Sequence, residues 1–118
     1  MDFEHSARSR EVVRQVERFV KERVVPSEQT FLDQLAHTDD WRAWTIPPVL
    51  EELKAEARDR GLWNLFLPDE EHGAGLDNRD YAPVAEATGR SFLAPEVFNC
   101  SAPDTGNAEV LVKYGSDE

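Results

Sequence analysis

Apolar residues recur at helical spacing along the first part of the chain. Between Ser6 and Val24 they follow steps of three and four residues and alternate with Arg, Glu and Lys. This stripe is typical of an amphipathic helix with one buried face. Pro26 has no amide hydrogen for a helix interior but suits the first turn of a new helix, so the pattern predicts a kink or restart there. The second helix then has an apolar face of Phe31, Leu32 and Leu35.

The apolar period breaks after the second helix. Trp41 and Trp44 lie in a segment with no clear period, and we expect a loop that carries buried rings. Pro47 and Pro48 stand where a third helix can start, and Gly61 suits a left-handed stop. The apolar residues of this third helix are Leu50, Leu53 and Ala57.

The second half of the chain alternates short apolar runs with turn residues. Residues 62–68 are apolar but short and end at Pro68, which indicates a buried connector. Asp77 or Asn78 can cap a fourth helix that ends near Gly89. The face of this helix is predicted to hold Tyr81, Val84, Ala85 and Thr88.

Two apolar segments follow the fourth helix. Residues 91–100 surround Pro95 and are predicted to be buried but only partly helical, whereas 105–114 suggest a last helix closed by Gly115. The sequence contains no convincing strand alternation and no internal repeat. The fold class is therefore predicted to be all-α, a helical bundle formed by a single domain over residues 1–118.

Composition and charge argue against several classes of function and location. The chain has 24 Asp and Glu against 13 Lys and Arg, a net charge of -11, so an anionic polymer would be repelled. We therefore expect no nucleic acid partner, and we interpret the acidity as a solvated surface. Residues 1–10 contain no apolar run, which argues against a secretory signal and against a spanning helix.

The lone Cys100 cannot form an internal disulfide, and no spacing of Cys or His offers a metal cage. We expect a reducing, cytoplasmic location. The alternative is an organelle protein whose N-terminal import sequence has been removed, and the sequence does not decide between the two.

Four motifs together resemble the N-terminal domain of the acyl-CoA dehydrogenase family. In the family their counterparts are a Gly-Leu helix end, a Pro-Glu-Glu-x-Gly-Gly-x-Gly-Leu turn, a Tyr-containing helix with Glu-x-x-Gly, and a later Tyr-Gly. The order and spacing carry the resemblance, which spans most of the chain. Residues 94–107 are similar to the subgroup that includes human family members ten and eleven. The four motifs here are 61–63, 67–76, 81–90 and Tyr114-Gly115.

The resemblance implies a flavoenzyme. Family members bind FAD and oxidise acyl-CoA at the α,β position: a carboxylate in a C-terminal bundle removes the α proton while the β hydride passes to flavin N5. They continue into a β-barrel-like middle domain and that bundle, and neither is in this chain. The resemblance thus implies no catalytic and no cofactor-binding residue here, no FAD bound to the chain alone, and a homo-oligomer for the intact enzyme.

Two departures from the family pattern do not affect the fold assignment. Ala74 replaces the second Gly of the turn, and Ala87 stands where many members carry Leu. The C-terminal Ser116-Asp117-Glu118 has the pattern of a helix start, an N-cap with acidic first-turn residues. From this pattern we expect a truncated chain, a proteolytic product or one piece of a split enzyme.

Residues 99–107 are the one candidate site. Small residues, Pro103 and Gly106 precede a helix, and the resemblance implies that this region lines the acyl-chain cavity. The expected wall residues are Ala102, Pro103, Thr105, Gly106 and Val110, with Asp104 or Asn107 able to meet a polar acyl substituent. A capped helix start with Asp104 or Thr105 as N-cap is the structural alternative, and both can hold.

Other candidates have simpler interpretations. The turn 73–75 could cradle a phosphate, but no strand leads into it. Glu70 and Glu71 are interpreted as solvated acids, because adjacent carboxylates rarely converge on one substrate. His5, His37 and His72 have no evident partner and are interpreted as surface histidines, Cys100 as a small buried residue, and the three Trp as core.

Two functions remain open from sequence. The first is a domain that closes the acyl pocket of an acyl-CoA dehydrogenase and is inactive alone. The second is a non-catalytic helical module that docks a partner protein. A contiguous exposed apolar patch would favour the first, because the missing domains would cover it.

Overall fold

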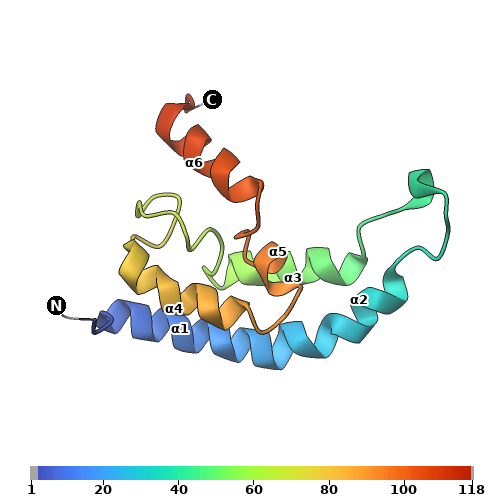
Figure 1. Ribbon diagram of the computed structural model, residues 1–118, viewed down its shortest axis with the longest axis horizontal. Helices are drawn as coiled ribbons and strands as arrows, with labels where there is room; N and C mark the ends of the chain where they lie inside the picture. The colour runs from blue at the N-terminus through green and yellow to red at the C-terminus, as the bar shows by residue number, and fades with distance from the viewer. Residues whose placement is uncertain (1–2, 118) are drawn as a thin grey trace.

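The computed structural model describes residues 3–117, and every regular element in that range is a helix. The predicted all-α fold class is confirmed. Figure 1 shows one long, bent rod of helices along one side of the molecule, with shorter helices packed against it. The described residues exclude Met1, Asp2 and Glu118. The predicted helix start at 116–118 therefore lies partly outside them.

The rod, residues 7–34, is a single run of four helical segments. They are α1 (Ala7–Phe19), the π-helical η1 (Val20–Val24), the 3₁₀ turn η2 (Val25–Ser27) and α2 (Glu28–Gln34). The prediction of a change at Pro26 is confirmed, although the α-helix ends earlier than Val24. Because Pro26 donates no hydrogen bond, the regular pattern cannot pass through it, and the wider η1 turn and tighter η2 turn accommodate the break.

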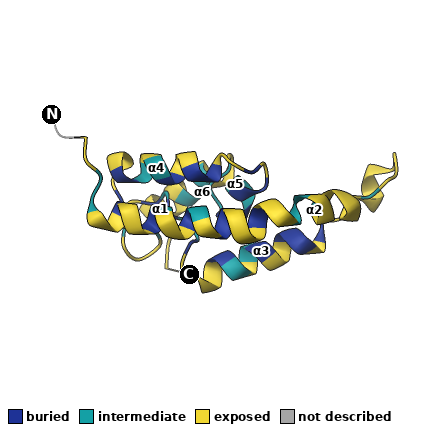
Figure 2. Ribbon diagram, turned by 90° about the horizontal axis from the view of Figure 1, so that it is seen from below, coloured by how far each residue is buried: buried dark blue, intermediate teal, exposed yellow. Residues whose placement is uncertain are grey.

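Other helices pack on the rod or on one another. Beside α1 lies α4 (Asn78–Thr88), and α3 (Pro48–Asp59) contacts α2 and the short α5 (Ala94–Val97). Asp77 caps α4 as predicted, accepting the amide of Asp80 at 2.8 Å. In Figure 2 the buried residues line the inner faces of these helices.

Two phenylalanines form the centre of the core. Phe19 on α1 and Phe98 after α5 are fully buried, and their rings meet edge to face with centroids 5.6 Å apart. Gly61 ends α3 with a φ of 70°, the left-handed stop that the sequence predicts. The connector that follows is irregular and buried as expected, through Leu62, Leu65 and Leu67.

The last helix, α6 (Asp104–Tyr114), buries no residue. Figure 1 shows it extending away from the other helices. The sequence correctly predicts the helix. Its apolar residues nevertheless remain exposed, because no other described element packs along them.

The predicted burial of two tryptophans is wrong. Trp41 and Trp44 are 66% and 62% exposed, around the 3₁₀ turn η3 (Trp41–Ala43). Residues 35–46 project past the end of the rod, away from the other helices (Figure 1). We call residues 35–46 the tip. A local hydrogen bond still orders it: the indole Nε1 of Trp44 donates to the Thr38 carbonyl at 3.0 Å.

Several predicted faces shift by about a residue. In α4 the buried positions are Asp80, Val84, Ala87 and Thr88, whereas the predicted Ala85 is exposed. Phe92 is 59% exposed and contacts Phe31 edge to face instead of entering the core. These shifts follow from a helical period that fixes a face only to within about one residue.

Candidate functional site

The predicted wall residues form the short link into α6 and its first turns. Pro103 follows a cis peptide bond from Ala102, and the Thr105 and Asn107 amides donate to the Ser101 and Pro103 carbonyls at 3.2 and 3.1 Å. All seven nominated positions are exposed except Thr105, which is partly covered. The segment is therefore an open surface of the described chain, with its backbone fixed by helical bonds.

Helix geometry divides these residues between two faces. Gly106 and Asn107 lie four and three residues before Val110 and share one side of α6 with it, with Pro103 one turn earlier. Thr105 lies on the other side, which agrees with its lower exposure. The structure thus brings Pro103, Gly106, Asn107 and Val110 together on one side of α6 and leaves Thr105 on the other side.

The expected helix cap at Asp104 or Thr105 is wrong. Pro103 occupies the N-cap position, with no side-chain hydrogen bond, and Asp104 is the first helical residue. The reason is that the helix starts one residue earlier than the polar side chains suggest, through the Asn107 amide bond to the Pro103 carbonyl. Asp104 still lies in the first turn, where a negative charge is favourable.

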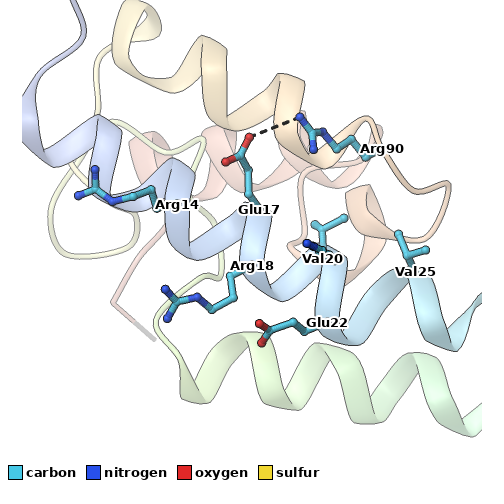
Figure 3. A pocket seen from close by; sticks show the side chains of 8 residues that line it. Arg14, Glu17, Arg18, Val20, Glu22, Val25 and Arg90 are labelled. Carbon is cyan, nitrogen blue, oxygen red and sulfur yellow. Dashed lines mark ion pairs between the residues drawn. The ribbon is translucent and has the colours of Figure 1, made fainter.

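A groove of about 530 Å³ runs along the outer face of the rod (Figure 3). Its cationic lining residues are Arg14, Arg18, Lys21 and Arg90, against only two glutamates. Arg90, just after α4, contacts Glu17 of α1 with 3.5 Å between Nη2 and Oε1. In a chain with a net charge of -11 this surface is locally basic. The sequence does not predict this groove, because no spacing rule joins Arg90 to the first helix.

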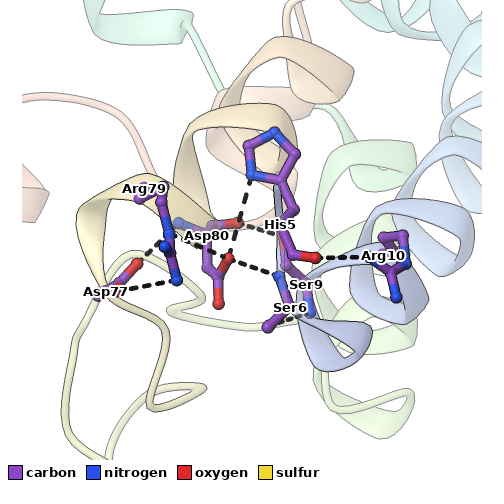
Figure 4. A network of polar contacts seen from close by, with 7 residues as sticks. All are labelled: His5, Ser6, Ser9, Arg10, Asp77, Arg79 and Asp80. Carbon is purple, nitrogen blue, oxygen red and sulfur yellow. Dashed lines mark hydrogen bonds and ion pairs between the residues drawn. The ribbon is translucent and has the colours of Figure 1, made fainter. Parts of the chain in front are cut away.

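A polar network joins the start of α1 to the first turn of α4 (Figure 4). The Ser6 amide donates to Asp80 Oδ1 at 2.9 Å, and the buried Ser9 hydroxyl donates to the Asp80 carbonyl at 2.6 Å. Hydrogen bonding from Ser6 is the main cause that holds the pKa of the Asp80 carboxyl below its ordinary value, and the nearby Arg79 adds to the effect. His5 Nδ1 lies 4.0 Å from Asp80 Oδ1. The network pairs the Ser6 amide and the Ser9 hydroxyl with Asp80, and it ties residues 74 positions apart.

Acid should weaken this junction. Because the pKa of Asp80 is lower folded than unfolded, the unfolded chain binds more protons, and stability falls as pH drops from about 5 through the folded pKa. We expect Asp80→Asn to lower the melting temperature at neutral pH and to flatten its decline in acid. Thermal melts across pH check this, with the exposed Asp39→Asn as control. An unchanged acid slope in Asp80→Asn would contradict the assignment.

The other titratable candidates are structural. Burial raises the pKa of the Cys100 thiol, although hydrogen bonds with Tyr81 and Thr88 oppose the shift, so the thiolate that a nucleophile requires is disfavoured. The prediction that His72 lacks a partner is wrong: its Nδ1 lies 3.0 Å from Asp69 Oδ1. The Asp69 carboxylate also accepts a hydrogen bond from the His72 amide, and this bond lowers the pKa of Asp69. The pair belongs to a local turn.

Residues 3–117 hold neither a candidate metal cage nor a candidate membrane span. No group of three or more His, Cys, Asp or Glu is placed to hold a metal ion in this range. Likewise, none of the described helices combines the length and apolar character that crossing a membrane requires.

Comparison with known proteins decides the family. The profile of the acyl-CoA dehydrogenase N-terminal domain matches residues 6–118. The chain belongs to the acyl-CoA dehydrogenase family. Acyl-CoA dehydrogenase family member 11 of Gallus gallus is 49% identical over 117 residues, which cover 98% of this chain and 15% of the relative. Family member 10 of Mus musculus is 44% identical over 114 residues, 92% of this chain and 10% of the relative. The predicted likeness to members ten and eleven is confirmed.

A solved structure supports the acyl-CoA dehydrogenase fold. It is a Mycobacterium abscessus protein with the provisional name acyl-CoA dehydrogenase, and it superposes with a TM-score of 0.85 at 51% identity. The match covers 97% of this chain and 30% of that protein. This chain therefore spans a small part of its acyl-CoA dehydrogenase relatives, between 10% and 28% of the curated ones.

The family's glycine turn has a packing reason in this acyl-CoA dehydrogenase domain. A Cβ added at Gly73 would lie 2.2 Å from the Leu67 carbonyl oxygen, so the turn closes against its own connector. Gly75 adopts a φ of 67°, which favours glycine. The next helix starts only at Asn78 with its own cap, Asp77. The turn is thus explained by packing and does not need a bound phosphate.

Proposed function

We propose that this chain is the N-terminal domain of an FAD-dependent enzyme that oxidises acyl-CoA at the α,β position, and that it walls the acyl pocket. Family membership supports the enzyme class. The observation that carries the wall role is the open face of Gly106, Asn107 and Val110 at the start of α6. Its small and apolar residues suit contact with an acyl chain once other domains cover it.

The flavin itself does not fit the groove on the rod. The groove on the rod is open and lined mainly by charged side chains, with no aromatic ring among them to stack on an isoalloxazine. A flavin also needs a largely apolar, enclosing site. We therefore assign FAD and the catalytic base to the middle and C-terminal domains of the intact enzyme, and no catalytic or cofactor-binding residue to this chain.

The exposed apolar surface favours a domain over an independent module. Val110, Leu111 and Tyr114 on α6 are 58%, 67% and 73% exposed. Exposed apolar side chains gathered on one helix normally mark a surface that another part of a protein covers. We expect the middle and C-terminal domains to pack there. The exposed Trp41 and Trp44 keep the partner-binding module as the second candidate.

A chimera tests the enzyme assignment. The chain replaces the matching N-terminal 30% of the Mycobacterium abscessus protein, and flavin content and acyl-CoA oxidation by an artificial acceptor are measured. We expect the chimera to retain FAD and to oxidise acyl-CoA, and the chain alone to do neither. Stoichiometric flavin on the chain alone, or an inactive chimera that still holds FAD, would contradict the proposal.

Two alanine substitutions test the wall. Ala102→Leu adds bulk beside the α6 face, whereas Ala55→Leu adds the same bulk at an exposed site on α3. In the chimera we expect Ala102→Leu to lower kcat/KM for long or branched acyl chains by about tenfold or more, because misfit of a methylene costs about 1–3 kcal/mol. Short chains and Ala55→Leu should be unaffected. Equal losses on short and long chains would argue against a wall.

We propose two further properties for the intact enzyme: a homo-oligomer and a cytoplasmic location. Sedimentation of the purified enzyme and fractionation of cells test them, respectively.

A further inference from the structure

Two asparagines in uncommon backbone conformations are bonded to each other. Among residues 3–117, Asn64 and Asn99 are the only residues other than glycine with a positive φ, at 58° and 53°. L-residues seldom adopt this region, although asparagine tolerates it better than most. Asn64 lies in the connector after α3, and Asn99 follows α5, 35 positions later. Such conformations persist where the surrounding structure holds them in place.

Asn99 ends α5 with a left-handed stop. Its amide donates to the Glu96 carbonyl at 3.1 Å, and the Cys100 amide donates to the Pro95 carbonyl at 2.7 Å. This pair of bonds is the Schellman arrangement, in which glycine is the usual left-handed residue. Glycine alone would satisfy the backbone here. The asparagine side chain at this position therefore needs an explanation of its own.

The Asn99 side chain reaches the connector. Its Nδ2 donates to Asn64 Oδ1 at 2.6 Å, and the Asn64 amide donates to the Phe98 carbonyl at 3.2 Å. Phe98 is fully buried at the centre of the core, and both asparagines are half-buried. We call Asn64, Asn99 and the two bonds between 64 and 98–99 the clamp. The clamp ties the end of α5 to the connector beside the core.

The clamp lies where α6 leaves the body of the domain. Helix α6 buries no residue, and Figure 1 shows it joined to the other helices through the link at 99–103. A helix that does not pack on its neighbours takes its direction from the residues at its base. In the described chain, Asn99 and Cys100, which bonds with Tyr81 and Thr88, make the last long-range hydrogen bonds before α6.

We propose that the clamp is a positioning element for the acyl pocket, because it sets the direction of α6 and so the place of its face of Gly106, Asn107 and Val110. The role rests on the proposed function of that face as a pocket wall. Val110 lies about 9 Å along the helix from its first residue, so a rotation of about 10° at the base moves it by about 1.5 Å. The clamp thus contributes to selectivity among acyl chains without touching the substrate.

Glycine at either position tests the clamp and preserves its backbone. Asn64→Gly and Asn99→Gly keep the positive φ and remove the side-chain bond. In each variant of the chain we expect the amide residual dipolar couplings of α6 to shrink relative to those of α1, because a helix released at its base averages over more orientations. The double substitution should add nothing to either single change, because both remove the same bond.

Acyl-chain selectivity tests the positioning role. The variants are placed in the chimera with the Mycobacterium abscessus protein, and kcat/KM is measured with butanoyl-CoA and palmitoyl-CoA. We expect both glycine variants to lower the ratio of palmitoyl-CoA to butanoyl-CoA activity by about tenfold, because a misplacement of about 1 Å has effects of this order or larger. Gln34→Ala is the control. It removes a half-buried bond to the Val49 amide, 2.9 Å long, and should change neither the selectivity nor the α6 couplings.

The two measurements separate failure of the clamp from failure of the wall. Unchanged α6 couplings in both glycine variants, or additive effects of the two substitutions, would overturn the clamp. Equal losses on the two substrates would overturn its positioning role, because a general loss of stability acts on both alike. If Ala102→Leu also leaves selectivity unchanged while the α6 couplings still shrink, the proposed wall fails and the positioning role fails with it.

Discussion

Phe19→Ala is expected to lower the free energy of unfolding by about 3–5 kcal/mol. Phe19 is fully buried, its ring meets Phe98 edge to face, and the Arg60 guanidinium lies 4.7 Å above it. Truncation removes these contacts and leaves a cavity where α1, α3 and α5 meet. Small domains have only about 5–15 kcal/mol in total, so a substantial unfolded fraction should exist at moderate temperature.

Chemical denaturation followed by circular dichroism measures this loss. Phe3→Ala is the matched control, because Phe3 is 73% exposed and its truncation should change stability by less than about 0.5 kcal/mol. Similar effects of the two substitutions would show that Phe19 is not at the centre of the core.

Gly73→Ala is expected to be the second most damaging change, at about 1–3 kcal/mol. The added Cβ would lie 2.2 Å from the carbonyl oxygen and 2.6 Å from the Cβ of Leu67. Backbone atoms cannot rotate away as a flexible side chain can. Because Leu67 is itself buried, relief of the clash would disturb the core.

The same substitution at Gly106 provides the control. A Cβ there meets nothing within 4 Å, and Gly106 lies inside α6. Alanine has the better helix propensity, so Gly106→Ala should leave the unfolding free energy unchanged or raise it by up to about 1 kcal/mol. Denaturation of both variants side by side checks the expected difference in sign. A loss at Gly106 as large as that at Gly73 would contradict the packing argument.

Local chemistry makes much of the fold predictable from the sequence. The apolar period predicts the helices, Asp77 predicts the start of α4, and Gly61 predicts the end of α3. Each signal acts within a turn or two of the chain, through capping bonds, backbone freedom or one helical face. The order and spacing of the motifs over residues 61–115 likewise predict the family, which the match to its N-terminal domain confirms.

Tertiary structure decided which of these apolar faces are covered. Trp41, Trp44 and Val110 have the composition of core residues, yet they are exposed because the tip at 35–46 and α6 project from the body. The sequence also contains no sign that Ser6 and Ser9 meet Asp80, or that Arg90 completes a basic groove with α1. Burial and long-range polar contacts depend on where distant segments meet, and periodicity describes each segment only by itself.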